Sequence, residues 1–428
     1  MHYYYTYYPK INSVEIPDAN LIGSFAPLET AHVDREKILR DAFAHPINTT
    51  PLHQIATPDD RVLIVLDDAI EPTPTVFPFY HIVQALHTAG VPDTNVTVLI
   101  ANRGHRASSN AEVDRKIGAE MRRKFKVFQS ALNEHDDSFH TFGTAHTDFG
   151  PISVTADARL RDASLIIGIS GTYPSRFKGF TGAGSLIFPG LGDEELIGQI
   201  YLSGAERPST EILGQMETPA RKLIREFLEF VPAYKFCVNL VVDRTLAITA
   251  CVAGAPGSVY RVSADVATQM MSFAIPEKAD IVLIDSHPFD TNIFQAAHAL
   301  YAALGVLRLG GEILIVSPLL EAMRPHSANL VNHHTESREM LLKMSRTGPL
   351  SRHPKAGARL AAMREVIDHS TRVTFVSNGA GKDDATKLGF HLSDSVQSAL
   401  NGAIGRLGST ARVAHIAHGG MAVPRVAV

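Results

Sequence analysis

A glycine-rich loop, residues 170–190, follows directly on an apolar run at 165–169. A short, unbroken apolar run is typical of a strand that is buried on both faces of a parallel sheet. In open α/β sheets, ligands bind in the crevice outside the carboxyl ends of the strands. The sequence therefore predicts a parallel sheet with a ligand site that includes this loop.

Strand, polar loop and helix alternate along the rest of the chain. Strands are predicted at 61–66, 96–101, 236–242, 246–252, 279–285, 312–316, 373–377 and 411–416, and the strands at 236–242 and 246–252 are expected to form a hairpin. Helices are predicted around 79–90, from Asn110 onward, at 220–228 and at 293–304. This alternation favours an α/β fold with mainly parallel, doubly wound sheets.

Two domains are expected from this pattern. We predict an N-terminal cofactor and catalytic domain at 1–270 and a C-terminal α/β domain at 271–410, with an active-site cleft between them. The remaining segment, 411–428, is expected to pack back on the first domain.

The composition of the chain argues against several classes of protein. The 428 residues carry a formal net charge of −4, so we expect no nucleic-acid partner. Cys237 and Cys251 form no CxxC pair, which argues against a disulfide framework and a cysteine-bound metal. Without an apolar run near ~18 residues or a signal peptide, we expect a cytoplasmic protein with no membrane association. Its partner is expected to be a small molecule, and a homo-oligomer is left open.

Charged side chains follow two of the predicted strands at the points where those strands end. Asp67 and Asp68 follow the first of these strands, and His105 and Arg106 follow the second. Because parallel strands end at one edge of a sheet, we expect these side chains to lie together beside the glycine-rich loop. His105 suits a general acid or base near neutral pH, with a simple bond to a backbone carbonyl as the alternative.

The neighbouring groups each have a functional and a structural interpretation. Arg106 can clamp a carboxylate or phosphate through a bidentate fork, or it can form a surface ion pair. One of Asp67 and Asp68 is expected to bind a ribose hydroxyl or a metal, although a turn-capping role is the alternative. Residues 181–185 can cradle a phosphate with backbone N–H groups. Neither a Walker motif nor GxGxxG is present, so a tight structural turn is the alternative.

Taken together, these segments resemble the nickel-dependent lactate racemase family over nearly the whole chain. The resemblance rests on residues 67–74, 104–106, 133–136 with 142–143, 178–190, 290–295, 352–356 and 418–424, which follow the family's motif order and spacing. It implies the family's nickel-pincer nucleotide, a pyridinium mononucleotide that accepts a hydride from the α-carbon of a 2-hydroxy acid and returns it to either face. Two histidines serve as acid and base, one for each face.

The resemblance also implies roles for individual residues. His105 corresponds to one of the two family histidines and Arg106 is expected to orient substrate or cofactor. The implied nucleotide-binding residues are Asp68, Thr181, Gly182, Gly184 and Ser185, and the implied substrate-binding residues are Arg176, Phe289 and Gln295.

Five positions depart from the family pattern. Ser175 occupies the position of the second histidine, Ser185 that of the lysine that links the cofactor, and Tyr201 that of the histidine that ligates nickel. Glu71 replaces an arginine, and Phe289 replaces the lysine that holds the substrate carboxylate. Serine is a weak base and forms no amide link, and phenol is a poorer nickel ligand than imidazole. Nearby Arg103, Arg176, Lys178 and His287 can compensate in part.

We therefore predict a divergent racemase or epimerase that acts on a 2-hydroxy acid or a related hydroxylated compound by hydride transfer to a non-covalently bound nickel-pincer nucleotide. Two alternatives stay open. One is a metal-independent isomerase or lyase on the same fold that uses His105 as its acid or base, and the other is a non-catalytic binding protein.

Overall fold

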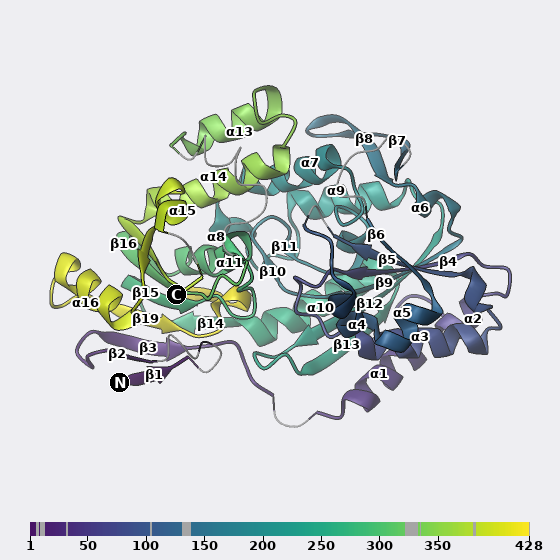
Figure 1. The fold of residues 1–428 in the computed structure, drawn as a ribbon, viewed down its shortest axis with the longest axis horizontal. Helices are drawn as coiled ribbons and strands as arrows, with labels where there is room; N and C mark the ends of the chain where they lie inside the picture. Colours follow the sequence, from purple (N-terminus) through teal and green to yellow (C-terminus); the bar gives the residue numbers. More distant parts are fainter. Residues whose placement is uncertain are drawn as a thin grey trace.

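Two six-stranded sheets dominate the computed structural model, which describes residues 1–5, 8, 13–30, 33–102, 105–130, 138–321, 333, 335–379 and 382–427. The sheets lie toward opposite ends of the long axis in Figure 1, with helices packed around both. The α/β class with mainly parallel sheets is therefore the one that the sequence predicts. No helix in the described part of the chain is long and apolar enough to cross a membrane.

The first sheet contains the strands that lead into the candidate site. In spatial order they are β13 (Ile248–Gly254), β12 (Tyr234–Val242), β9 (Leu165–Gly171), β4 (Val62–Asp67), β5 (Val96–Ala101) and β6 (Lys126–Gln129). β13 and β12 form the predicted antiparallel hairpin, and the other neighbours pair in parallel. β4, β5 and β9 therefore end at the same edge.

Both faces of this sheet are covered because successive side chains of a strand point to opposite faces. In β4, Val62, Ile64 and Leu66 belong to one apolar core, and Leu63 and Val65 belong to another. The first core includes residues of α2 (Leu52–Ile55), α3 (Val76–Thr88), α4 (Asn110–Ile117) and α5 (Ala119–Lys124), and the second includes residues of α6 (Arg159–Asp162), α7 (Glu194–Ala205) and α9 (Pro219–Leu228). A strand buried on both faces gives the unbroken apolar runs seen in the sequence.

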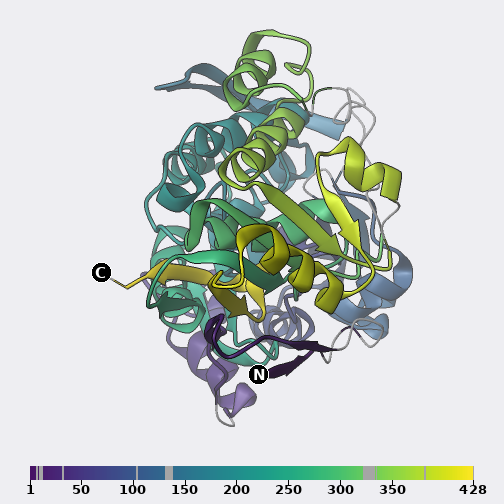
Figure 2. The same ribbon diagram turned by 90° about the vertical axis from the view of Figure 1, so that its left-hand side faces the viewer.

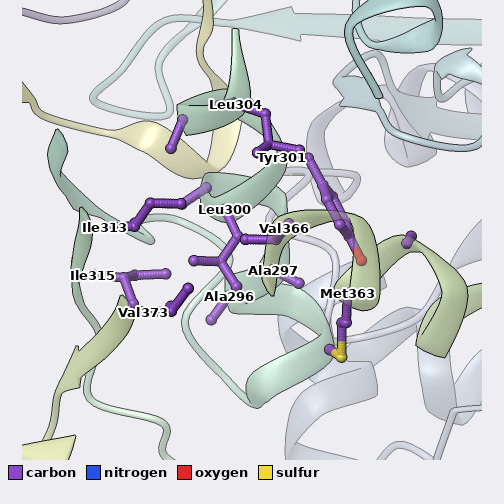
Figure 3. Packing of buried hydrophobic residues seen from close by; sticks show 14 of the residues in the cluster. Ala296, Ala297, Leu300, Tyr301, Leu304, Ile313, Ile315, Met363, Val366 and Val373 are labelled. Atoms are coloured by element: carbon purple, nitrogen blue, oxygen red, sulfur yellow. The ribbon is translucent and has the colours of Figure 1, made fainter. Parts of the chain in front are cut away.

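The second sheet is parallel throughout. In spatial order its strands are β18 (His391–Ser393), β17 (Arg372–Val376), β16 (Leu307–Val316), β15 (Ala279–Asp285), β19 (Val413–Ile416) and β3 (Leu21–Phe25). One face packs on α11 (Ile293–Leu304) and α14 (Pro354–His369), where Leu300, Ile315 and Val366 meet in the core drawn in Figure 3. The other face packs on α16 (Val396–Leu407) and the N-terminal ribbon of β1 (His2–Tyr4) and β2 (Ser13–Glu15).

The remaining elements join or border these sheets. They are α1 (Arg35–Ala44), a hairpin of β7 (Phe139–Thr147) and β8 (Gly150–Asp157), the short pair β10 (Pro174–Ser175) and β11 (Gly179–Phe180), α8 (Ser209–Ile212), α10 (Pro256–Met271), the pair β14 (Ser272–Ile275) and β20 (Val423–Val426), α13 (Arg338–Thr347) and α15 (Lys382–Lys387). Figure 2 shows the N-terminal ribbon below the second sheet and α13 above it.

The ends of the chain depart from the expected organisation. β3 lies at the edge of the second sheet although residues 1–270 are expected to form the first domain, and β19 joins the same sheet between β15 and β3. Within segment 411–428, β19 therefore lies in the second sheet, and β20 pairs with β14. The expectation that this segment packs back on the first domain stays a prediction. Arg425 does reach back, because its guanidinium donates to the carbonyls of Thr210 and Leu213. The division of the chain at 270 stays a prediction.

One long helix was missed in the sequence. No helix is among the elements predicted for this segment, yet α10 begins at Pro256 and continues to Met271. Proline at the first helical position is a common helix start, since its missing N–H has no partner there in any case. This signal was present in the sequence.

Candidate functional site

The carboxyl ends of β4 and β5 bring two predicted residues into contact. His105 follows β5, and its Nδ1 lies 2.9 Å from Oδ2 of Asp68, which follows β4. Asp68 is almost fully buried and His105 is largely so. A carboxylate bound to one ring nitrogen fixes the orientation of the imidazole and leaves the other nitrogen, Nε2, for chemistry.

Asp67 has a structural role, which separates it from Asp68. Its Oδ1 accepts from Nζ of the buried Lys116 at 2.8 Å, and its Oδ2 accepts from the Thr73 hydroxyl at 2.8 Å. The same ammonium also donates to the carbonyls of Glu71 and Thr73. Lys116 therefore holds the loop after β4 in shape, and Asp68 is the carboxylate of the pair that faces His105.

The glycine-rich loop forms a tight, buried turn. Gly182, Gly184 and Ser185 are buried, and the Asn239 carboxamide lies beneath them and accepts from the Ala183 N–H at 2.9 Å. Gly182 has φ +99°, and a Cβ there would lie 2.4 Å from Asn239 Nδ2, so glycine is required. The structure thus supports the turn interpretation of 181–185, and a nucleotide-binding role for Gly182, Gly184 and Ser185 stays a prediction.

A small pocket lies beside His105 and draws on both parts of the chain. Its lining comprises Glu71, His105, Ser175, Arg176, Phe177, Lys178, Thr181 and Tyr201, followed by Phe294, Gln295, His298, Tyr301 and Arg359. Six of the predicted site residues thus meet there: His105, Ser175, Arg176, Thr181, Gln295 and Tyr201. The pocket holds about 40 Å³, which is enough for a few water molecules.

Two of the predicted cations are engaged by protein groups. Arg106 binds the carboxylates of Glu112 and Glu321 and does not line the pocket, which is the ion-pair interpretation of this residue. These bonds raise the pKa of Arg106 above its usual value, with the Glu112 bond as the main cause. Arg176 does line the pocket, yet its Nη2 donates to Glu365 of α14 at 2.9 Å. Both guanidiniums thus connect segments far apart in the sequence.

Arg359 on α14 is the cation that faces His105, and the sequence analysis missed it. Its Nη2 lies 3.3 Å from Nε2 of His105, and its guanidinium carbon lies 5.0 Å from the Phe294 ring centroid and 5.7 Å from that of Tyr201. Within the described part of the chain, no carboxylate forms an ion pair with Arg359. The available signal was its position, one helical turn after Lys355 of the motif at 352–356.

His298 is a second pocket histidine that the sequence analysis missed. It follows Gln295 by three residues on α11, so the two side chains share one helix face. Burial, followed by the charges of Lys178 and Arg359, lowers the pKa of His298 to about 4, so its imidazole is neutral at physiological pH. Its ring stacks on Phe289 at 4.7 Å between centroids. Phe289 therefore lies behind the pocket wall and supports His298.

Some of the predicted site residues do not line this pocket or fall outside the described part of the chain. Arg103 and the motif at 133–136 fall outside the described residues. His287, expected to compensate for a lost cation, does not line the pocket, and its Nδ1 lies 3.4 Å from Asp290 Oδ2. Lys178, which is also expected to compensate for a lost cation, does line the pocket.

The residues at the family's cofactor positions do not fit the nickel-pincer nucleotide. The Ser185 hydroxyl offers no amine for a covalent link, is buried without a hydrogen-bond partner in the described structure, and lies outside the pocket lining. Tyr201 presents a phenol where imidazole suits nickel better, and its ring packs against Phe177 at 4.6 Å between centroids. The pocket volume of about 40 Å³ is far below the ~300–1,000 Å³ of typical ligand pockets.

Comparison with known proteins places this geometry in context. Residues 7–209 match the family model described as the lactate racemase N-terminal domain. A lactate racemase of Lactiplantibacillus plantarum is 22% identical over 422 residues, which cover 95% of this chain and 96% of that protein. A lactate racemase of Thermoanaerobacterium thermosaccharolyticum is 22% identical over 311 residues, which cover 71% of each chain.

Solved structures share the fold. The lactate racemase apoprotein from Thermoanaerobacterium thermosaccharolyticum superimposes with a TM-score of 0.82 at 18% identity, covering 96% of this chain and 97% of that one. A Thermotoga maritima protein superimposes with a TM-score of 0.71 at 16% identity, covering 94% of this chain and 100% of that one. The overall fold is therefore common to all three proteins.

Proposed function

Because this chain belongs to the lactate racemase superfamily, we propose that it is an isomerase, a racemase or epimerase of small 2-hydroxy acids, whose acid and base are its own side chains. One observation carries the proposal. The imidazole of His105 is held between the Asp68 carboxylate on Nδ1 and the Arg359 guanidinium at Nε2. A base beside a cation without a carboxylate partner is the arrangement that a carboxylic acid substrate needs.

Arg359 binds the substrate carboxylate in this proposal. A guanidinium pairs with a carboxylate through two parallel hydrogen bonds. Since the pocket holds about 40 Å³, the substrate enters only when Arg359 moves off His105, and its carboxylate then takes the place of that contact. Gln295, which lines the same pocket, supplies a hydrogen bond to the 2-hydroxyl group.

His105 then removes the proton from carbon 2. The C–H bond breaks, the proton moves to Nε2, and the electron pair is delocalised into the carboxylate that Arg359 holds. Asp68 stabilises the imidazolium that forms. Tyr201 donates its hydroxyl proton to the other face of carbon 2, and water carries the proton from His105 back to Tyr201. The reverse sequence converts the other enantiomer.

Replacing Asp68 by asparagine is expected to lower kcat by about 10- to 100-fold. The carboxamide keeps the shape but no longer stabilises the imidazolium, and its NH₂ group can impose the wrong tautomer on His105. Steady-state kinetics checks this, with Asp148→Asn on the exposed turn between β7 and β8 as the matched control. An unchanged kcat in Asp68→Asn would contradict the positioning role.

Replacing Tyr201 by phenylalanine is expected to slow interconversion of the enantiomers by about 100-fold, the loss of one general acid. Exchange of the hydrogen on carbon 2 with solvent should continue in one enantiomer, since His105 still removes that proton. NMR in deuterated water follows exchange, and chiral chromatography follows interconversion. Equal loss of both activities would argue against a separate role for Tyr201.

The family's own chemistry is the second candidate, and the matches to lactate racemases favour it. In it, Thr181, Gly182, Gly184 and Ser185 would hold a nickel-pincer nucleotide without a covalent link, and that group would supply hydride-transfer chemistry at carbon 2. The two candidates are separated by assaying purified protein on a panel of enantiopure 2-hydroxy acids with and without a chelator, beside elemental analysis. We expect interconversion that survives chelation in protein without stoichiometric nickel. Stoichiometric nickel and activity lost with it would favour the second candidate.

A further inference from the structure

A second cavity lies at the carboxyl edge of the second sheet, apart from the pocket at His105. The neighbouring strands β15, β19 and β3 run in parallel, and residues at or just beyond their ends line a cavity of about 510 Å³. We call this the tyrosine cavity, because Tyr3, Tyr4, Tyr5 and Tyr8 form part of its wall. Both its place in the fold and its volume are typical of small-molecule sites.

The tyrosine cavity and the catalytic pocket share no lining residue. The loop after β15 separates them. On one side, the Phe289 ring packs against Tyr173 and His298, near the catalytic pocket. On the other side, the His287 ring lies 5.4 Å from that of His418, which lines the tyrosine cavity.

Two polar atoms of the cavity wall lack a hydrogen bond. Tyr5 and His415 are only 6% and 3% exposed, and neither the Tyr5 hydroxyl nor His415 Nε2 has a partner in the described structure. The two rings are close, with centroids 6.0 Å apart. Each unmade bond of a buried polar group costs about 1–3 kcal/mol, and native structures leave few of them. Two such atoms beside one cavity indicate a ligand that bonds to both.

The rest of the wall fixes the His415 ring. Its Nδ1 lies 2.7 Å from the Ser24 hydroxyl, and the ring stacks on Tyr3 at 4.0 Å with an interplanar angle of 28°. Burial raises the pKa of Tyr5 well above its usual value, with the Asp285 charge as a smaller cause. The Tyr5 hydroxyl therefore stays protonated, and it can both donate and accept a hydrogen bond.

The charges around the cavity largely cancel. Arg244 pairs with Glu29, and both line the wall. The Asp285 carboxyl accepts the backbone N–H groups of His287 and His418, both at 3.0 Å. Burial lowers the pKa of His415 to about 4, so that ring is neutral at physiological pH. Burial raises the pKa of the Asp285 carboxyl to about 7, so this carboxyl carries only a partial negative charge near neutral pH. An anionic ligand would meet no unpaired cation among the described residues of this wall.

We propose that the tyrosine cavity binds a neutral heteroaromatic molecule, whose flat faces pack between tyrosine rings and whose polar edge bonds to the Tyr5 hydroxyl and His415 Nε2. Tyrosine side chains suit such a ligand, because each offers an apolar face and a polar end. This site is independent of the isomerase activity proposed above.

The test uses the full-length protein and defined probes. Saturation-transfer NMR compares four neutral rings (adenine, cytosine, nicotinamide and indole) with two charged ones (benzoate and benzamidine). We expect at least one neutral ring to bind, and Tyr5→Phe and His415→Phe each to weaken its binding by about 2- to 10-fold, the loss of one hydrogen bond. Tyr80→Phe, at an exposed position of α3, is the matched control and should bind as the unchanged protein does.

The controls keep the outcome clear. Because a buried hydroxyl without a hydrogen bond carries a desolvation cost, Tyr5→Phe should unfold at a temperature no lower than that of the unchanged protein. His105→Gln should bind the ring with unchanged affinity. The proposal is overturned if no neutral ring binds, or if Tyr5→Phe and His415→Phe bind the ring as tightly as the unchanged protein does. It is also overturned if a charged ring binds more tightly than every neutral ring.

Discussion

Replacing His105 by glutamine is expected to lower kcat by about 10³- to 10⁴-fold, with the fold unchanged. Glutamine fills much of the space of imidazole and keeps a polar contact to Asp68, but it neither removes nor returns a proton near neutral pH. The effect should appear in kcat and not only in KM, because Arg359 still binds the carboxylate. Steady-state kinetics on the best 2-hydroxy acid provides the measurement.

His146→Gln is the matched control for that change, since His146 is an exposed histidine on β7, away from the pocket. It should leave kcat unchanged. If His105→Gln retained most of the activity while folding normally, His105 would not be the base, and the structural interpretation of a loop histidine would stand.

Replacing Arg359 by methionine is expected to lower kcat/KM by about 100- to 1,000-fold. Methionine retains much of the packing on Phe294 and Tyr201 but removes the charge that holds the carboxylate and stabilises the electron pair from carbon 2. Truncating one partner of a buried, hydrogen-bonded charge pair typically costs about 2–5 kcal/mol, which corresponds to this range. Arg359→Lys should recover part of the loss, because it restores the charge without the planar fork.

Arg364→Met supplies the comparison on the same helix, because Arg364 pairs with Asp368 and does not line the pocket. It should change kcat/KM by less than twofold. Normal kcat/KM in Arg359→Met would show that the substrate anion binds elsewhere, with Lys178 as the next cation to test.

Local patterns in the sequence predicted most of the framework. The apolar runs at 61–66 and 165–169 became β4 and β9, and the helix at 293–304 has the predicted bounds. The strand ends then placed Asp68 and His105 close together, as parallel topology requires. These features are predictable because strand burial and helix periodicity act over a few neighbouring residues.

The partners of the predicted residues were beyond such patterns. Arg106 and Arg176 are engaged by Glu321 and Glu365, which lie 215 and 189 residues further along the chain. Arg359 reaches His105 across 254 residues. Whether an arginine is engaged by a carboxylate or available to a ligand depends on tertiary contacts of this kind, and no local periodicity records them.

The C-terminal strand illustrates the same limit. Residues 411–416 read correctly as a strand, yet nothing local shows which sheet the strand joins. Pairing of β19 with β15 and β3 depends on packing between distant segments, which in the case of β3 are almost 400 residues apart. The sequence therefore predicted the strand but not the sheet that it joins.

The source of the hydrogen on carbon 2 tests the account most directly. The protein is incubated in deuterated water with one enantiomer of its best 2-hydroxy acid, and the product enantiomer is separated and analysed by NMR and mass spectrometry. Proton transfer through His105 and Tyr201 predicts a product that carries deuterium at carbon 2. A product that retains its original hydrogen would contradict the account, because hydride transfer returns the same hydrogen atom to the substrate.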